Sequence, residues 1–360
     1  MTNMLEPWIS TPSDLASSSM EGYAKASKPK LLVIYWPTAC GKTALTIELA
    51  KQHNGEVINA DSRQIYRGMD IGTGKIRPEE MEWIPHHMLD IRDITELYWV
   101  GEFAPEARRI IAEIHARGKL PILSGGTGLF IDSVVGNFTI PEVVADWGYR
   151  DELEAFREKE GNEALWQKLN DVDPAYASEL DPRNYRYVIR WLEIWKATGQ
   201  SKKVLGQKTE SPYDFLRITP YDGDREKLYE KINQRVLQMF QTGLINEVDT
   251  LLKKFEYRDL IPSSSGNWVK AKRREVEPGI QVNKLSATAE TNSESDTGLD
   301  SRLCGNDGLL LQKLPGLNAI GYREILPYLA GEQSLEKTIE LVQQNSRNYA
   351  KRQLTWFRRY

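Results

Sequence analysis

The feature that most constrains this chain is a run of branched apolar residues that leads directly into a loop of small and polar residues. Residues Leu31 to Tyr35 are apolar without interruption, which is typical of a strand buried on both faces of a parallel sheet. Helical spacing then begins at Lys42. The loop between them, Trp36 to Thr43, matches the phosphate-binding pattern G-x-x-x-x-G-K-[ST] except at its first position, where Trp36 replaces Gly.

A loop of this kind surrounds a phosphate with backbone N–H groups and with the N-terminus of the following helix. We therefore predict that phosphate is bound by the residues Thr38, Ala39, Cys40, Gly41, Lys42 and Thr43. Lys42 would neutralise the phosphate charge, and the Thr43 hydroxyl would hold Mg²⁺. A chance turn between a strand and a helix is the alternative interpretation of this loop.

Two further apolar strands are each followed by a loop with functional side chains. Glu56 to Ile58 precede Asp61, and Leu120 to Leu123 precede a glycine-rich loop that contains Thr127. Because ligands of open α/β sheets bind outside the carboxyl ends of the strands, the three loops predict a single site. The Asp61 carboxylate would act there as a Mg²⁺ ligand, as a general base or only as the cap of a turn, and its position does not separate these roles.

The remaining patterns predict an α/β core interrupted by a helical insertion. The expected parts are a core in two pieces (residues 30–139 and 208–261), a helical insertion (residues 140–207) and a C-terminal helical part of the core (residues 313–360). Residues 1–29 and 262–312 are rich in Ser, Thr and charged residues and lack apolar periodicity. We therefore expect a disordered tail and a disordered insert.

Composition limits the classes of partner. Lys and Arg total 47 and Asp and Glu total 51, so a nucleic-acid partner would need a local basic patch. The two cysteines and four histidines show no metal-binding spacing, which argues against a zinc site and fits a reducing compartment. The longest apolar run is far too short to cross a bilayer. We expect a cytoplasmic monomer with no membrane partner.

The order of the motifs resembles the tRNA dimethylallyltransferases, also called tRNA isopentenyltransferases. The resemblance runs collinearly from about Lys30 to Tyr360, apart from residues 262–312. The segments that carry it are Pro37 to Thr43, Asp61 to Lys75, Pro85 to Asp90, Gly125 to Phe130, Arg190 to Glu193, Ile320 to Glu324 and Lys351 to Arg358. It implies a P-loop NTPase-like parallel sheet core with a helical insertion that binds tRNA.

The resemblance also implies a reaction: a dimethylallyl group passes from dimethylallyl diphosphate to N6 of the adenosine 3′ to the anticodon in tRNA. The loop from Thr38 to Thr43, together with Arg235 and Mg²⁺, would then hold a diphosphate, and no nucleoside triphosphate would be hydrolysed although the loop is of a nucleotide-binding, ATP-binding type. Asp61 is implied as the general base, with Lys42 and Thr127 also catalytic. The residues implied to contact the anticodon stem-loop are Asp61, Ser62, Arg63, Gln64, Thr127, Arg150, Arg186 and Arg190.

Three positions depart from the family pattern. Trp36 adds bulk beside the expected phosphate, Tyr187 stands where the family has a second Arg beside Arg186, and Lys231 replaces the first Arg of a later helix. Two alternative functions therefore stay open: a catalytically impaired P-loop protein that binds tRNA, and a small-molecule kinase or adenylate prenyltransferase. The helical insertion and the tract Lys351 to Gln353 favour tRNA over a free nucleotide.

The arginines of the helical insertion also have two interpretations. Arg and Tyr alternate between Arg183 and Arg190, which suits phosphate pairing and base stacking in single-stranded RNA. The alternative is an amphipathic helix with Trp191 and Trp195 in its core and solvated arginines. His86 and His87 are expected to be structural turn residues and not catalysts.

Overall fold

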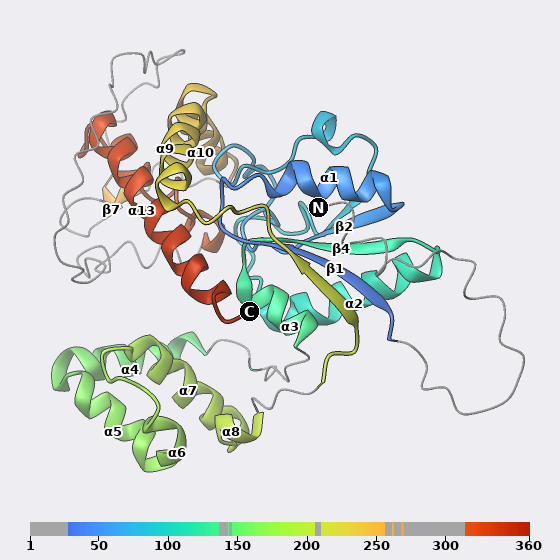
Figure 1. The fold of residues 1–360 in the computed structure, drawn as a ribbon. Coiled ribbons are helices and arrows are strands. Elements are labelled where there is room, and N and C mark those ends of the chain that lie inside the picture. The colour runs from blue at the N-terminus through green and yellow to red at the C-terminus, as the bar shows by residue number, and fades with distance from the viewer. Residues whose placement is uncertain are drawn as a thin grey trace, which may run out of the picture.

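The structure is a computed structural model that describes residues 28–136, 143, 146–205, 210–255, 261–262, 268–269 and 314–360. Within these residues, five strands form a parallel sheet in the order β3-β2-β4-β1-β5 (Figure 1). The strands are β1 (Lys30–Tyr35), β2 (Gly55–Asn59), β3 (His86–His87), β4 (Leu120–Gly125) and β5 (Asp214–Ile218). The prediction of a P-loop-like parallel α/β fold is confirmed.

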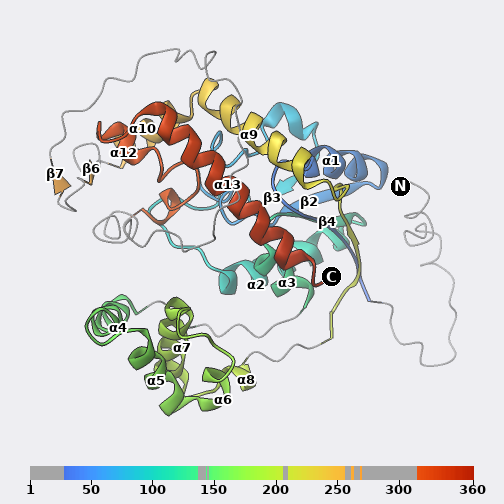
Figure 2. The same ribbon diagram turned by 60° about the vertical axis from the view of Figure 1, so that its left-hand side comes forward.

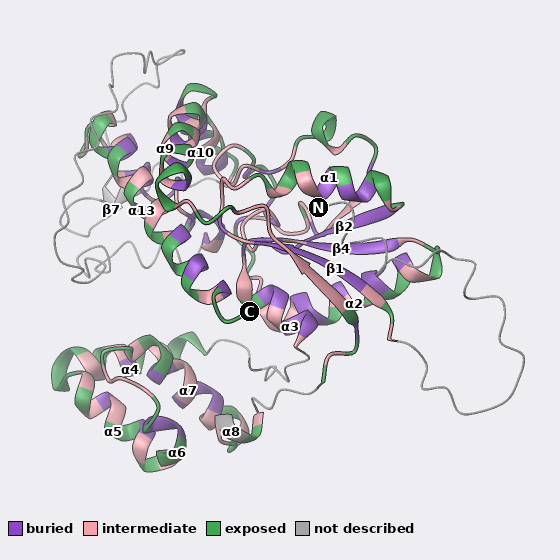
Figure 3. Ribbon diagram, viewed as in Figure 1, coloured by how far each residue is buried: buried purple, intermediate pink, exposed green. Residues whose placement is uncertain are grey.

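Helices cover both faces of the sheet, which explains why β1 is apolar at every position after Lys30. Leu32 and Ile34 pack under α1 (Lys42–Gln52), whereas Leu31 and Val33 pack against α2 (Val100–Ala116) and α3 (Gly128–Val135). A strand that alternates between two covered faces reads as a continuous apolar run. Figure 3 shows the buried positions along the strands and on the helix faces that meet them.

A second apolar core lies beside the carboxyl edge of the sheet. It is built by α9 (Arg225–Gln241), α10 (Leu244–Lys254), α12 (Leu326–Leu329) and α13 (Leu335–Phe357), together with the segment from Ile65 to Met69. Figure 2 shows α13 running alongside α9 and ending near α3. Near its end, Trp356 Nε1 donates to Asp132 Oδ2 at 3.0 Å, which attaches the C-terminal helix to the sheet domain.

The helical insertion forms a separate body in Figures 1 and 2. Its helices are α4 (Trp147–Glu160), α5 (Asn162–Val172), α6 (Pro174–Ala177), α7 (Tyr185–Thr198) and α8 (Lys202–Leu205). Leu165, Leu169 and Val188 are fully buried in its own small core. None of the helices in the described part of the chain combines the length and the apolar character that a membrane span requires.

Several elements differ from the sequence-based expectation. The expected turn at His86 and His87 is wrong, because these residues form β3 and pair with Val57 and Ile58. A two-residue strand carries too little alternation to be found from sequence. Of the expected disordered tail (residues 1–29) and insert (residues 262–312), only residues 28–29, 262 and 268–269 are described. Trp268–Val269 (β7) pairs antiparallel with Ile261–Pro262 (β6).

Candidate active site

The loop after β1 folds into a tight turn that leads into α1. Its backbone has positive φ at Trp36 (+133°), Ala39 (+63°) and Gly41 (+90°), and Gly41 is the N-cap of α1. Lys42 Nζ donates to the carbonyl of Pro37 at 2.7 Å, and the Cys40 thiol donates to the same oxygen at 2.9 Å. Positive φ at two non-glycine residues is uncommon and marks a loop that its surroundings hold in a strained conformation.

The Trp36 side chain is part of an aromatic cluster. Its indole is stacked 5.6 Å from the Phe357 ring of α13 and 5.8 Å from the Tyr221 ring that precedes α9, with interplanar angles of 20° and 26°. Tyr35 meets it edge-on at 5.0 Å. The Trp36 indole, which the sequence places beside the expected phosphate, therefore packs against the C-terminal part of the core. The Trp36 backbone keeps a φ that Gly would adopt without strain.

Two cations, Lys42 and Arg235, lie near this loop and near the Asp61 carboxylate. Burial lowers the pKa of Lys42, an effect opposed by the nearby Cys40 and Asp61. Burial also lowers the pKa of Arg235, which Asp61 opposes in the same way. Arg235 lies 3.5 Å from both Thr38 Oγ1 and the Gly74 carbonyl. The Glu80 carboxylate also opposes the shift of Arg235. Burial disfavours the charged forms of both Lys42 and Arg235, so an anionic ligand beside them would stabilise both cations.

Asp61 lies in a turn at the carboxyl end of β2. Asn59 Oδ1 accepts from the Asp61 N–H at 3.2 Å, and Asp61 Oδ1 accepts from the Arg63 N–H at 2.9 Å. No residue in the described part of the chain donates a hydrogen bond to Oδ2. One oxygen therefore caps the turn, as the simplest interpretation expects, and the second stays available as a hydrogen-bond acceptor.

The glycine-rich loop after β4 meets the Asp61 turn. Thr127 Oγ1 accepts from the Ser62 N–H at 3.0 Å. A Cβ at Gly125 would lie 2.2 Å from the Ala60 carbonyl oxygen, and one at Gly128 would lie 2.3 Å from the Trp356 ring. The groups that approach these glycines closely therefore belong to the protein itself.

Gln64 and Arg63 point to the neighbouring segments of the core. Gln64 Nε2 donates to the carbonyls of Thr73 and Gly74, each at 3.3 Å, and Arg63 donates to the Pro315 carbonyl at 3.3 Å. The loop before Gly74 is held in turn by Glu247 on α10, which accepts from the backbone N–H groups of residues 70–72 and from the Tyr322 hydroxyl. Tyr322 belongs to the resembling segment Ile320 to Glu324, for which the sequence alone indicates no role.

Two residues of α13 that the sequence does not assign to the site contact it. Burial, followed by the Asp61 carboxylate, raises the pKa of Tyr349 to about 12, although a hydrogen bond with Thr127 opposes the shift. Four residues later, Gln353 accepts from the Thr38 N–H at 3.2 Å and donates to the Gly126 carbonyl at 2.8 Å. A spacing of four residues places both side chains on one face of a helix, which is the signal that could have paired them.

The arginines expected to contact tRNA lie on the helical insertion, apart from this cluster. Arg150 forms a two-pronged ion pair with the buried Glu193 at 2.9 and 2.8 Å, and Arg190 binds the same carboxylate as well as the Val143 carbonyl. Burial alone would raise the pKa of Glu193, but the hydrogen bonds from Arg150 and Arg190 hold it below its usual value. Arg186 is exposed, with its guanidinium 5.8 Å from the centre of the Tyr185 ring.

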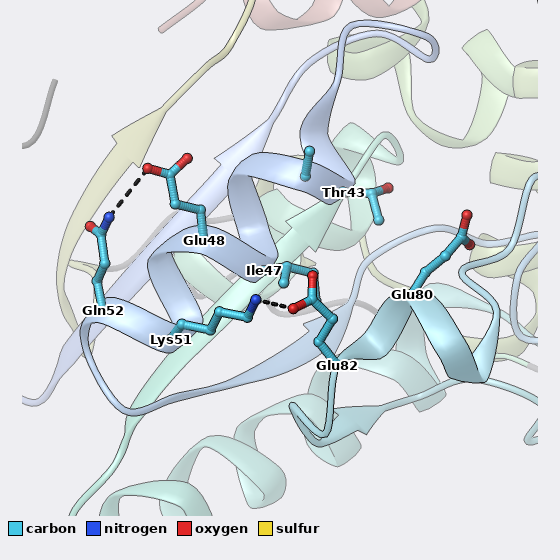
Figure 4. A pocket seen from close by; sticks show the side chains of 8 residues that line it. Thr43, Ile47, Glu48, Lys51, Gln52, Glu80 and Glu82 are labelled. Atoms are coloured by element: carbon cyan, nitrogen blue, oxygen red, sulfur yellow. Dashed lines mark hydrogen bonds and ion pairs between the residues drawn. The ribbon is translucent and has the colours of Figure 1, made fainter.

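A cavity of about 510 Å³ lies on the outer side of α1 (Figure 4). Thr43 lies at its end nearest the phosphate loop, and Glu48, Glu80 and Glu82 contribute carboxylates to its walls. Glu80 and Glu82 come from the turn around the short 3₁₀ helix η3 (Pro78–Met81). The cavity lining has three carboxylates and one lysine, Lys51, which is paired with Glu82, so this cavity does not favour phosphate.

A phosphate-binding loop, an available carboxylate and two cations at one edge of a parallel sheet define a P-loop enzyme with an anionic substrate. The chain belongs to the IPP transferase family, whose family model matches residues 64–276 and 299–360. The resemblance seen in the sequence is therefore confirmed.

Known relatives agree with this assignment. The chain is 41% identical over 334 residues to a tRNA dimethylallyltransferase of Halalkalibacterium halodurans, an alignment that covers 92% of this chain and 88% of the relative. Its fold is similar to the crystal structure of the full-length tRNA isopentenylpyrophosphate transferase from Bacillus halodurans, with a TM-score of 0.56 and 40% identity over 92% of this chain and 88% of that one. A eukaryotic dimethylallyltransferase acting on tRNA gives a TM-score of 0.65 at 28% identity, over 91% of this chain and 69% of that one.

Proposed function

We propose that this chain is a cytoplasmic, monomeric tRNA dimethylallyltransferase. It transfers the dimethylallyl group of dimethylallyl diphosphate to N6 of the adenosine 3′ to the anticodon. The observation that carries the proposal is the meeting of an anion-binding half, formed by the phosphate loop with Lys42 and Arg235, and a carboxylate half, formed by Asp61 and Thr127. The first half suits a diphosphate leaving group and the second suits a nucleophile that must lose a proton.

The site contains a group for each part of the transfer step: cations for the leaving group and a carboxylate for the proton. The bond from the allylic carbon to the diphosphate oxygen breaks, and its electron pair stays on the diphosphate. The N6 lone pair forms the new carbon–nitrogen bond, and the N6 proton passes to Asp61. Lys42 and Arg235 stabilise the charge that develops on the leaving group, and partial burial strengthens this effect by excluding water.

A magnesium ion fits the phosphate loop. Thr43 is exposed in the first turn of α1 and offers one hydroxyl oxygen. The described residues contain no cluster of three or more His, Cys, Asp or Glu side chains that would hold a metal by themselves. Mg²⁺ characteristically takes few protein ligands and completes its shell with water and substrate phosphates. When bound, it would supply further stabilisation of negative charge on the diphosphate.

The target base has to leave the anticodon stack to reach this site. Extruding a base costs a few kcal/mol of lost stacking, which contacts to the flanking RNA offset. Ser62, Arg63, Gln64 and Thr127 surround the Asp61 side of the site, and Arg150, Arg186 and Arg190 lie on the helical insertion. We propose that the first group binds the flipped adenosine and that Arg186 contacts the anticodon stem-loop, whereas Arg150 and Arg190 support the insertion through Glu193.

The test is mass spectrometry of nucleosides from tRNA that has been incubated with the protein, dimethylallyl diphosphate and Mg²⁺. We expect a dimethylallyl adduct on the adenosine 3′ to the anticodon, and none when tRNA is replaced by AMP. Tight tRNA binding without any adduct would favour the catalytically impaired alternative. Prenylation of AMP would favour the adenylate prenyltransferase.

Replacing Arg186 with Ala should weaken tRNA binding without destabilising the protein. Arg186 is exposed and lies over the Tyr185 ring, and we propose that it contacts a phosphate of the RNA, so its loss should reduce the slope of log K against log salt by about 1. Arg150→Ala is the matched comparison, since it removes one partner of the buried Glu193 and should destabilise the insertion by about 2 kcal/mol while Arg190 still binds that carboxylate. Binding titrations at several salt concentrations and thermal unfolding separate the two effects. An unchanged salt slope in Arg186→Ala would remove Arg186 from the RNA interface.

A further inference from the structure

Gln353 joins the two loops of the site with a single side chain. It lies on α13 with only 5% of its surface exposed. Its Oε1 accepts from the Thr38 N–H at 3.2 Å, and its Nε2 donates to the Gly126 carbonyl at 2.8 Å. Both ends of the amide are therefore used, one by the loop after β1 and the other by the loop after β4.

The two loops present opposite groups, and this restricts which side chain can lie between them. Thr38 offers a donor and Gly126 offers an acceptor. A carboxylate could not donate to Gly126, and an ammonium could not accept from Thr38, whereas a primary amide satisfies both. Gly126 also fits this contact, because a Cβ there would lie 2.4 Å from Gln353 Nε2. Both loops therefore match a primary amide at this position, and we call the two hydrogen bonds of Gln353 the Gln353 bridge.

Each loop belongs to a different half of the site. Thr38 Oγ1 lies 3.5 Å from Arg235, one of the two cations that face the expected diphosphate. Gly126 precedes Thr127, which accepts from the Ser62 N–H beside Asp61 on the expected adenosine side. The Thr38 N–H, which the sequence predicts to bind phosphate, donates to Gln353 instead. The hydrogen bond from the Thr38 N–H to Gln353 therefore helps to connect the diphosphate half of the site with the adenosine half.

We propose that Gln353 is a positioning residue that fixes the distance between the diphosphate half and the adenosine half of the site. This inference rests on the proposed function, because prenyl transfer needs the allylic carbon and N6 in attack geometry at about 3–3.5 Å. A shift of about 1 Å between the halves costs on the order of 10²-fold in rate. Each half still binds its own ligand after such a shift, so the rate of transfer falls more than either affinity.

The helix that carries Gln353 is held firmly enough for this role. Its neighbours Leu354 and Phe357 are buried, and Trp356 is hydrogen-bonded to Asp132 on α3. Side chains on anchored helices hold a geometry more tightly than side chains on loops. Beyond the pairing of Tyr35 with Gly125 in the sheet, the two loops are therefore joined by Gln353 on α13, a residue that lies 227 positions after Gly126 in the chain.

The experiment compares Gln353→Met and Gln353→Glu with the control Gln343→Met. Met keeps a similar side-chain length and removes both hydrogen bonds, whereas Glu keeps the acceptor for Thr38 and places an oxygen against the Gly126 carbonyl. Gln343 lies on the same helix and donates to the Asn233 carbonyl at 3.3 Å, outside the two loops. We expect kcat to fall roughly ten- to hundred-fold in both Gln353 variants, with KM for dimethylallyl diphosphate and tRNA affinity within about twofold. We expect Gln343→Met to keep kcat.

Hydrogen exchange of the loop amides provides a readout that does not depend on activity. In Gln353→Met, exchange should accelerate together in residues 37–43 and 124–128, and Gln343→Met should leave both segments unchanged. An inactive wild-type protein would overturn the proposed function but would leave this measurement able to test the bridge. Equal kcat in wild type and Gln353→Met, or faster exchange in only one loop, would overturn the positioning role.

Discussion

Asp61→Asn should lower kcat for prenyl transfer by a factor of about 10² or more and leave tRNA affinity within about twofold. The substitution retains an oxygen that can accept from the Arg63 N–H, so the turn after β2 keeps its cap. The amide cannot take a proton from N6, so only the general-base function is lost. Single-turnover kinetics with saturating tRNA and dimethylallyl diphosphate measure the chemical step directly.

Asp61→Ala is the informative companion of this variant. It removes the base and the cap together, and the loss of a capping interaction costs about 1 kcal/mol of stability. We therefore expect Asp61→Ala to be as inactive as Asp61→Asn but to unfold at a lower temperature. If Asp61→Asn turns over at the wild-type rate, Asp61 is only the cap of its turn and another group must accept the proton.

The fold could be predicted from the sequence wherever local patterns determine it. Leu31 to Tyr35 alternate between two covered faces, so their burial on both sides is visible as an uninterrupted apolar run. The helical spacing that begins at Lys42 marks the first residue of α1. The three loops after β1, β2 and β4 could be assigned to a single edge because parallel strands place their carboxyl ends together.

Contacts between distant segments could not be predicted in the same way. Gln353 is part of a tract that favours tRNA at the level of sequence, yet its side chain is buried between two loops of the sheet domain. Arg150 and Arg190 look alike in sequence to any RNA-binding arginine. Arg190 and Glu193 are three residues apart on α7, whereas only the packing of α4 against α7 brings Arg150 to the same carboxylate. Charge and periodicity indicate that an arginine can bind an anion, but they do not show whether a carboxylate of the protein itself is that anion.

Trp36→Ala should destabilise the protein by about 3 kcal/mol, because it removes an indole stacked between Phe357 and Tyr221. Trp36→Gly loses the same stacking but releases the strain of a non-glycine residue at a φ of +133°, and should recover about 1 kcal/mol of that loss. Denaturant titration should therefore rank the free energies of unfolding as wild type, then Gly, then Ala.

Trp36→Phe is the control for the aromatic contribution. It keeps a ring in the cluster and removes the Trp36 Nε1 donor, which is buried without a hydrogen-bond partner in the described part of the chain. Its stability should stay within about 1 kcal/mol of wild type, since the gain from removing an unsatisfied donor offsets the smaller ring. An Ala variant as stable as wild type, with a higher kcat/KM for dimethylallyl diphosphate, would show that the indole obstructs the phosphate loop. A stability that falls from wild type to Gly and again from Gly to Ala would show that aromatic packing holds a glycine-like backbone in place.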